Sequence, residues 1–179
     1  DCGRSWHFRG SVDPGVFRSD PVLESDADGR FHYFSMFFSP PPDLSRDCHV
    51  FTSADGGRTW GPPVAAYGGD KPWMTVDLTA GPGRNHVYAA WNPNYSETGT
   101  DFFTRSIDGG GSFQFPVTMA ARPVIGTLAV AERAIGQPRH LPTLGDIDDF
   151  GADLDTTVPQ LLHRRLQRIV LHIGEHQPH

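Results

Sequence analysis

Long hydrophobic runs, dense basic patches and a cysteine framework are all missing from this 179-residue sequence. No stretch of about 18 consecutive apolar residues occurs, so we expect no membrane-spanning helix. The formal net charge is −6, and the 15 lysines and arginines do not cluster. Since nucleic-acid binding needs a concentrated positive surface, we expect no nucleic-acid partner. Two cysteines, Cys2 and Cys48, are too few for a disulfide framework.

The composition is that of a folded chain built from short elements. Apolar residues make up 37% of the sequence and include 12 phenylalanines, which is enough for a core. Glycine (20) and proline (16) are both frequent. This combination favours short strands joined by tight turns over long helices.

A short motif occurs three times at nearly equal spacing. It reads Asp-x-Gly-x-Ser/Thr-aromatic and begins at Asp1, Asp55 and Asp108, which are 54 and 53 residues apart. Such a period indicates a repeat architecture. The motif residues, including a serine two positions upstream of the second and third copies, are Asp1, Gly3, Ser5, Trp6, Ser53, Asp55, Gly57, Thr59, Trp60, Ser106, Asp108, Gly110, Ser112 and Phe113.

The motif predicts a self-contained turn between two strands. An aspartate can accept hydrogen bonds from the backbone of its own turn, and glycine adopts backbone angles that other residues resist. The hydroxyl residue can bond to a neighbouring backbone group, and the aromatic ring can pack under the hairpin.

The segments between the motifs predict the remaining strands. Residues 20–26 and 31–34 read as two strands joined by a turn, and residues 70–77 and 87–91 repeat this pattern. Residues 101–106 lead into the third motif, and 112–117 start a strand after it. Four strands in about 50 residues is the size of a β-propeller blade.

These motifs and the strands around them resemble the bacterial neuraminidase repeat, or Asp box, of sialidase-like β-propellers. The resemblance covers residues 1–131 and implies an all-β fold, an incomplete β-propeller of four-stranded antiparallel blades. Because such propellers need about six blades to close, the remaining blades are expected to be absent from this chain. The open edges of an unclosed piece predict a marginal chain that tends to associate.

The repeat is lost after residue 131, and two explanations of the tail stay open. Residues 124–130 look like the first strand of another blade, but no further motif follows. The tail is then either foreign to the fold or a genuine extension. Residues 132–157 are interpreted as a linker, and a Thr157-x-x-Gln160 capping pattern with apolar residues on one face predicts a helix over 158–173.

The strand order predicts which loops lie on each of the two faces of the propeller. The motif turns and the first hairpin turns should share one face, whereas the loops 39–47 and 92–100 should lie on the opposite one. In sialidase-like propellers the site lies on that opposite face. The resemblance therefore suggests catalytic candidates Tyr95, Glu97, Asp20 and Asp70, and substrate-binding candidates Arg18, Arg46 and Lys71.

The roles of these candidates come from the chemistry of sialidases. Arginines bind the carboxylate of the sugar, a tyrosine activated by a glutamate attacks the anomeric carbon, and an aspartate supplies the acid or base. The simpler interpretation of Tyr95 and Glu97 is two solvated loop residues. Asp20 and Asp70 open equivalent strands, and this equivalence favours a structural role for both.

The resemblance leaves two functions open. One is a glycoside hydrolase fragment acting on terminal sugars of glycans, inactive in isolation because a central site draws on all blades. The other is a non-catalytic propeller that binds glycans or proteins, since the motif occurs in both kinds of protein. Either implies an extracellular or cell-envelope location and a glycan or glycoconjugate partner.

No cofactor or metal is expected. The acidic run 146–155 reads as a solvated linker, and Ser25–Gly29 reads as a hairpin turn because no glutamate follows at the spacing of a calcium loop. His172 and His176 have ligand spacing, but Gly174 lies between them. Cys2 and Cys48 should lie about 20 Å apart, at opposite ends of a blade, and therefore remain free thiols.

Overall fold

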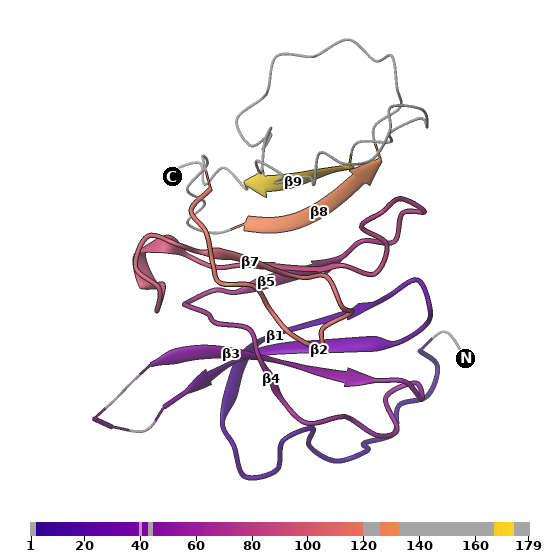
Figure 1. The fold of residues 1–179 in the computed structure, drawn as a ribbon. Helices are drawn as coiled ribbons and strands as arrows, with labels where there is room; N and C mark the ends of the chain where they lie inside the picture. Colours follow the sequence, from indigo (N-terminus) through magenta and orange to yellow (C-terminus); the bar gives the residue numbers. More distant parts are fainter. Residues whose placement is uncertain (1–2, 40, 43–44, 120–125, 133–166, 174–179) are drawn as a thin grey trace, which may run out of the picture.

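The computed structural model describes residues 3–39, 41–42, 45–119, 126–132 and 167–173. Within these ranges the chain is all-β, with three antiparallel sheets and a single 3-10 turn, η1 (Pro93–Tyr95). Figure 1 shows the sheets stacked as successive layers that do not close into a ring. No helix in the described part of the chain is long and apolar enough to cross a membrane.

The first sheet, sheet A, has four strands in sequence order. They are β1 (Arg18–Ser25), β2 (Phe31–Phe38), β3 (Arg46–Ser53) and β4 (Val64–Ala65). Alternation of apolar residues forms these strands, because every second side chain points to the same face. A bulge interrupts β1 between Ser19 and Val22.

The second sheet, sheet B, repeats this order. It contains β5 (Trp73–Val76), β6 (Val87–Ala90) and β7 (Phe103–Ser106). A bridge between Phe103 and Val117 places the start of a fourth strand where β4 lies in sheet A. The prediction that a motif joins a third strand to a fourth is therefore confirmed for the second motif, whereas after the third motif sheet B has, among the described residues, this single bridge and no fourth strand.

The helix predicted over 158–173 is wrong in its described part. Residues Gln167–Ile173 form β9, which pairs antiparallel with β8 (Gly126–Glu132) in a third sheet, sheet C. Ile169, Val170 and Ile173 are β-branched, so the same apolar positions suit a strand once a partner strand is present. Residues 158–166, and nearly all of the predicted linker at 132–157, lie outside the described residues.

Sheets A and B correspond strand by strand. Leu23 pairs with Tyr33, and Tyr33 with Phe51, four residues before Asp55. In sheet B the matching row is Met74, Ala89 and Thr104, and Thr104 is four residues before Asp108. The correspondence holds across three strands and the turn that follows them.

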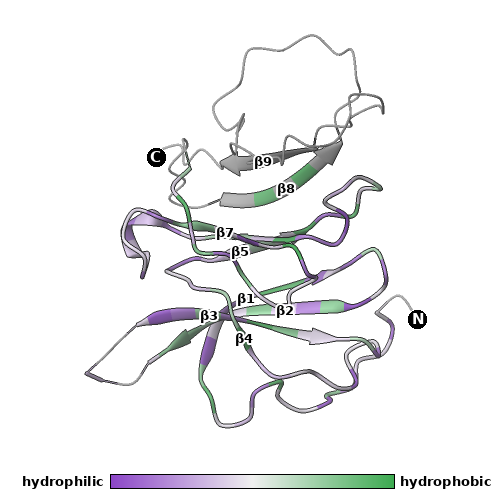
Figure 2. Cartoon of the chain, viewed as in Figure 1, coloured by the Kyte–Doolittle hydropathy of each residue, from purple (hydrophilic) through white to green (hydrophobic). Residues whose placement is uncertain are grey.

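The sheets pack face to face through two apolar clusters. One lies between sheets A and B and includes Phe34, Val50, Met74 and Val87. The other lies between sheets B and C and includes Phe103 and Leu128. Figure 2 shows the hydrophobic residues concentrated on the strands and the hydrophilic ones in many of the connecting turns. The first strands of successive sheets are neighbours, since β1 packs against β5 and β5 against β8.

The turn after β7 contacts the preceding sheet. Gly110 has a φ of 86°, and a Cβ placed on it would lie 3.2 Å from Nδ1 of His32, a fully buried residue of β2. A Cβ at residue 110 would therefore require the His32 ring to move by a few tenths of an ångström. The turn after β7 thus lies against sheet A at the end where the motifs lie.

Replacing Gly110 by alanine should therefore destabilise the junction of sheets A and B. The left-handed backbone and the contact with His32 together predict a loss of roughly 1–3 kcal/mol in the free energy of unfolding, measured by urea titration. Gly56→Ala is the matched control, because Gly56 has a φ of 74° but nothing within 4 Å of its Cβ position. Equal losses in the two variants would contradict the contact.

Cys48 is buried and makes no disulfide, which confirms the predicted free thiol at this position; Cys2 lies outside the described residues. Burial raises the pKa of the Cys48 thiol to about 12. Since the thiolate is the reactive form, we expect Cys48 to resist a maleimide at pH 8 and to react on unfolding. Labelling followed by mass spectrometry tests this, and rapid modification of Cys48 in the native chain, or a Cys2–Cys48 bridge under non-reducing conditions, would refute it.

Candidate functional site

The two internal copies of the motif, which we call the boxes at 55–60 and 108–113, have the same hydrogen-bond network. In the box at 55–60, the amide of Gly57 donates to Ser53 Oγ (2.9 Å), and Ser53 Oγ donates to Asp55 Oδ1 (2.9 Å). The amide and hydroxyl of Thr59 donate to the two carboxylate oxygens of Asp55 at 2.8 and 2.6 Å. The carboxylate thus closes the turn on itself, as the motif predicts.

The box at 108–113 repeats these contacts. The amide of Gly110 donates to Ser106 Oγ (2.8 Å), which donates to Asp108 Oδ1 (2.6 Å). The amide and hydroxyl of Ser112 donate to the carboxylate of Asp108 at 2.9 and 2.7 Å. Ser106 is fully buried, and Ser53 nearly so, so each serine is a fixed anchor at the end of its strand.

The first motif is described in part. Gly3 has a φ of 79°, close to the 80° of Gly57, and Trp6 donates from Nε1 to the carbonyl of Gly3 (3.0 Å). The indole of Trp6 lies against Gly3 as that of Trp60 lies against Gly57. Asp1 is outside the described residues.

The hydrogen bonds of the boxes lower the pKa of both aspartates to about 2. For Asp55 the largest cause is the Thr59 hydroxyl, and for Asp108 it is the Ser106 hydroxyl. A carboxylate whose folded-state pKa is depressed stabilises the fold above its unfolded pKa of about 4. That stability is lost as the pH falls from about 4 towards 2.

Ser106→Ala should raise the pKa of Asp108 by about one unit, because the variant lacks a donor to the ionised form. Carboxyl ¹³C chemical shifts followed between pH 1.5 and 6 measure this. Asp55 is the internal control, and its pKa should not change in the same spectra. An unchanged pKa of Asp108 would show that Ser106 does not hold the carboxylate.

Three of the predicted site residues come together at the other end of the sheets. Arg46 begins β3, and its backbone amide donates to Glu97 Oε1 (2.6 Å). The guanidinium of Arg46 lies 5.1 Å from the centre of the Tyr95 ring and 5.5 Å from that of Phe38. We call Arg46, Tyr95, Glu97 and Phe38 the loop cluster. Arg46 and Ser53 are the first and last residues of β3, so the loop cluster lies about 23 Å from the box of sheet A.

The loop that carries Tyr95 and Glu97 packs against two glycines, Gly68 and Gly69, in the segment between β4 and β5. The amide of Glu97 donates to the carbonyl of Gly68 (3.0 Å), and a Cβ on Gly69 would lie 2.6 Å from the carbonyl oxygen of Tyr95. Trp91 donates from Nε1 to Ser96 Oγ (2.8 Å) and closes the loop. The loop is therefore anchored at both ends.

Asp20 and Lys71 form a second pair across the two sheets. Lys71 Nζ lies 3.4 Å from Asp20 Oδ1, and both residues have a positive φ, 52° and 48°. Each precedes a proline, so Lys71, not Asp70, is the counterpart of Asp20 in sheet B. This corrects the predicted equivalence of Asp20 with Asp70, whose carbonyl instead accepts from the amide of Asn92 (2.9 Å).

Arg18 is held apart from the loop cluster. Its guanidinium donates from Nε and Nη2 to Asp13 Oδ2 at 2.9 and 2.6 Å, and it lies 4.7 Å from the centre of the Phe51 ring. The side chain is only 8% exposed. Arg18 therefore holds the N-terminal segment to the sheet and is not open to a ligand.

Sequence reasoning missed two contacts around the arginines. Phe38 lies opposite Arg46 in the register of β2 and β3, and that pairing becomes visible only once the hairpin is aligned. Asp13 lies five residues before Arg18 in a segment with no strand pattern, so no signal in the sequence identifies it.

Two other buried carboxylates anchor the hairpin turns. Asp26 Oδ1 accepts from the amides of Asp28 (2.9 Å) and Arg30 (2.8 Å), and Asp77 Oδ1 accepts from the amide of Thr79 (2.8 Å). Asp26 thus has the geometry of a turn residue, which agrees with the hairpin interpretation of Ser25–Gly29.

No group of three potential ligands in the described ranges could hold a metal ion. His172 lies within β9, whereas His176 and the acidic run 146–155 lie outside the described residues.

No protein-family model, no curated protein and no solved structure matches this chain.

Proposed function

We propose that this chain is part of a sialidase-like Asp-box β-propeller that acts on terminal sugars of glycans. The observation that carries the proposal is the repetition of one box geometry at corresponding corners of two consecutive sheets. The contacts of β1 with β5 and of β5 with β8 support it, since first strands of successive blades are neighbours around a propeller axis.

In the proposed function the loop cluster contributes to a sugar site. Arg46 would bind the sugar carboxylate, and its position over the Tyr95 ring would bring that carboxylate next to the tyrosine. Tyr95 would act as nucleophile with Glu97 as its base, and Asp20 or Asp70 would supply the acid. Lys71 would hold Asp20 in place.

The alternative is a propeller that binds glycans without cleaving them. The state of the arginines favours this second candidate: Arg18 is neutralised by Asp13, and Arg46 alone is left in the loop cluster. A sialidase site needs several convergent arginines, so neither candidate predicts turnover by this chain alone.

The proposal predicts weak binding of N-acetylneuraminic acid at the loop cluster, with a Kd in the millimolar range, about −4 kcal/mol. Chemical shifts of the Arg46 and Glu97 amides in an NMR titration measure it. Arg46→Gln should weaken binding about tenfold, because it removes the bidentate donor.

The methyl ester of the same sugar is the matched ligand control, since it lacks the charge. Equal binding of the acid and the ester, or unchanged binding in Arg46→Gln, would contradict the proposal. A fluorogenic sialoside separates the two candidates when the assay is run on a protein that carries these two sheets within a closed propeller. Hydrolysis that is lost in Tyr95→Phe supports the enzyme. Binding without hydrolysis supports the alternative.

A further inference from the structure

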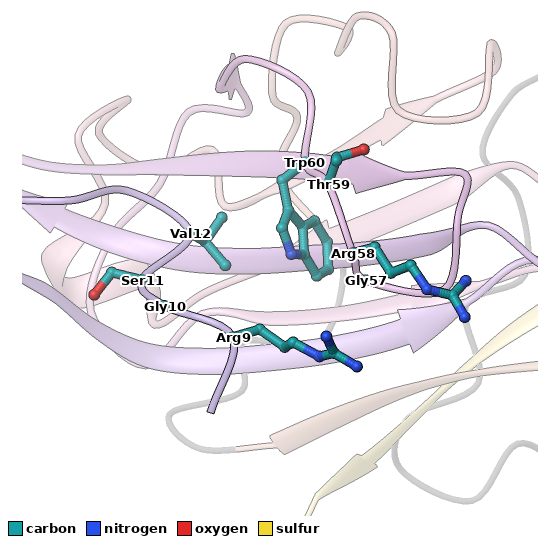
Figure 3. A pocket seen from close by; sticks show the side chains of 8 residues that line it. All are labelled: Arg9, Gly10, Ser11, Val12, Gly57, Arg58, Thr59 and Trp60. Atoms are coloured by element: carbon teal, nitrogen blue, oxygen red, sulfur yellow. The ribbon is translucent and has the colours of Figure 1, made fainter. Parts of the chain in front are cut away.

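We propose that a pocket beside the box at 55–60 binds a sugar that carries an oxyanion, either a sulfate or a carboxylate. The pocket lies between the N-terminal segment at 9–12 and the box at 57–60. Arg9, Ser11, Arg58 and Trp60 line it with their side chains, and none of its lining residues is acidic. Figure 3 shows the side chains of Arg9 and Arg58 extending in the same direction beside the indole.

The charge of the pocket comes from two exposed arginines. Arg9 has no carboxylate partner among the described residues, and Arg58 uses Nη1 to donate to the carbonyl of Asp55 (3.0 Å). The carboxylate of Asp55 is directed into its own turn, where it accepts from Ser53, Arg58 and Thr59. Two guanidinium groups at one pocket repel each other, and an oxyanion between them relieves that repulsion and accepts their forked donors.

The indole of Trp60 makes the pocket suitable for a sugar. Trp60 packs edge-on against Tyr33, with 6.0 Å between ring centres, and also lines the pocket. Its Nε1–H has no acceptor among the described residues. A ring with an apolar body and a free donor offers a pyranose both an apolar surface and a hydrogen bond.

The box at 108–113 lacks these features, because its residues differ at two positions. Gly111 stands where Arg58 stands, and Phe113, the counterpart of Trp60, packs against the core between the sheets. Arg30 and His32 lie against this turn, since a Cβ on Gly109 would be 3.5 Å from Arg30 Nη1 and one on Gly110 3.2 Å from His32 Nδ1. The pocket thus belongs to the box of sheet A and lies at the opposite end of β3 from the loop cluster, so it does not depend on the proposed function.

The test is an NMR titration of the chain at low salt with N-acetylglucosamine 6-sulfate and, separately, with glucuronic acid. Binding with a Kd in the millimolar range, with shifts at the amides of Ser11 and Gly57, is the expected result. The Arg9→Gln, Arg58→Gln double variant should weaken binding at least about tenfold. Arg105→Gln on β7 matches each single variant in charge and should bind as the unchanged chain does. Each single variant gives a separate readout if the double variant unfolds.

Several outcomes would overturn the proposal. Equal affinity for uncharged N-acetylglucosamine would remove the role of the oxyanion. Equal affinity for inorganic sulfate, unaffected by Trp60→Phe, would mean an anion site without a sugar. If no sugar binds and the double variant only changes self-association, the pocket is a contact for another sheet. Binding of one sugar and not the other supports the proposal and identifies the anionic group.

Discussion

The hydrogen bonds to one buried serine at the end of a third strand determine the geometry of each internal box. Ser53 and Ser106 each accept from a glycine amide and donate to the box aspartate. These bonds set the direction in which the chain leaves the turn and begins its fourth strand. In the second of these turns the glycine also contacts His32 of the preceding sheet. The same local turn therefore sets the edge of one sheet and lies against the preceding one.

This arrangement leaves the two sheets in different surroundings. Leu23 and Met74 occupy corresponding positions, but Leu23 is 58% exposed, whereas Met74 is fully buried against sheet A. The face of sheet A that carries Leu23 is thus open, whereas the corresponding face of sheet B is covered by sheet A. The box of sheet A is likewise open beside the N-terminal segment, while Arg30 and His32 lie against that of sheet B.

Much of sheets A and B could be predicted from the sequence. An aspartate and a glycine at fixed spacing favour one kind of tight turn, and the strands on either side of each turn then follow. The tail could not be predicted, since the apolar residues of 167–173 fit a helix and a strand equally until the pairing with β8 decides. The loop cluster followed from the order of the strands, which places Arg46 near Tyr95 and Glu97. Side-chain partners such as Asp13 depend on long-range packing, and the match of Asp20 with Lys71 depends on the following proline and not on the shared aspartate.

The most direct test of the serial repeat is native-state hydrogen exchange of the amides of Gly57 and Gly110. Both donate to a buried serine hydroxyl in the same geometry, at 2.9 and 2.8 Å. Both amides should exchange slowly, with protection that falls together as denaturant is added. Exchange of either amide at the rate of an unfolded chain, under conditions where the strands remain protected, would contradict the serial repeat.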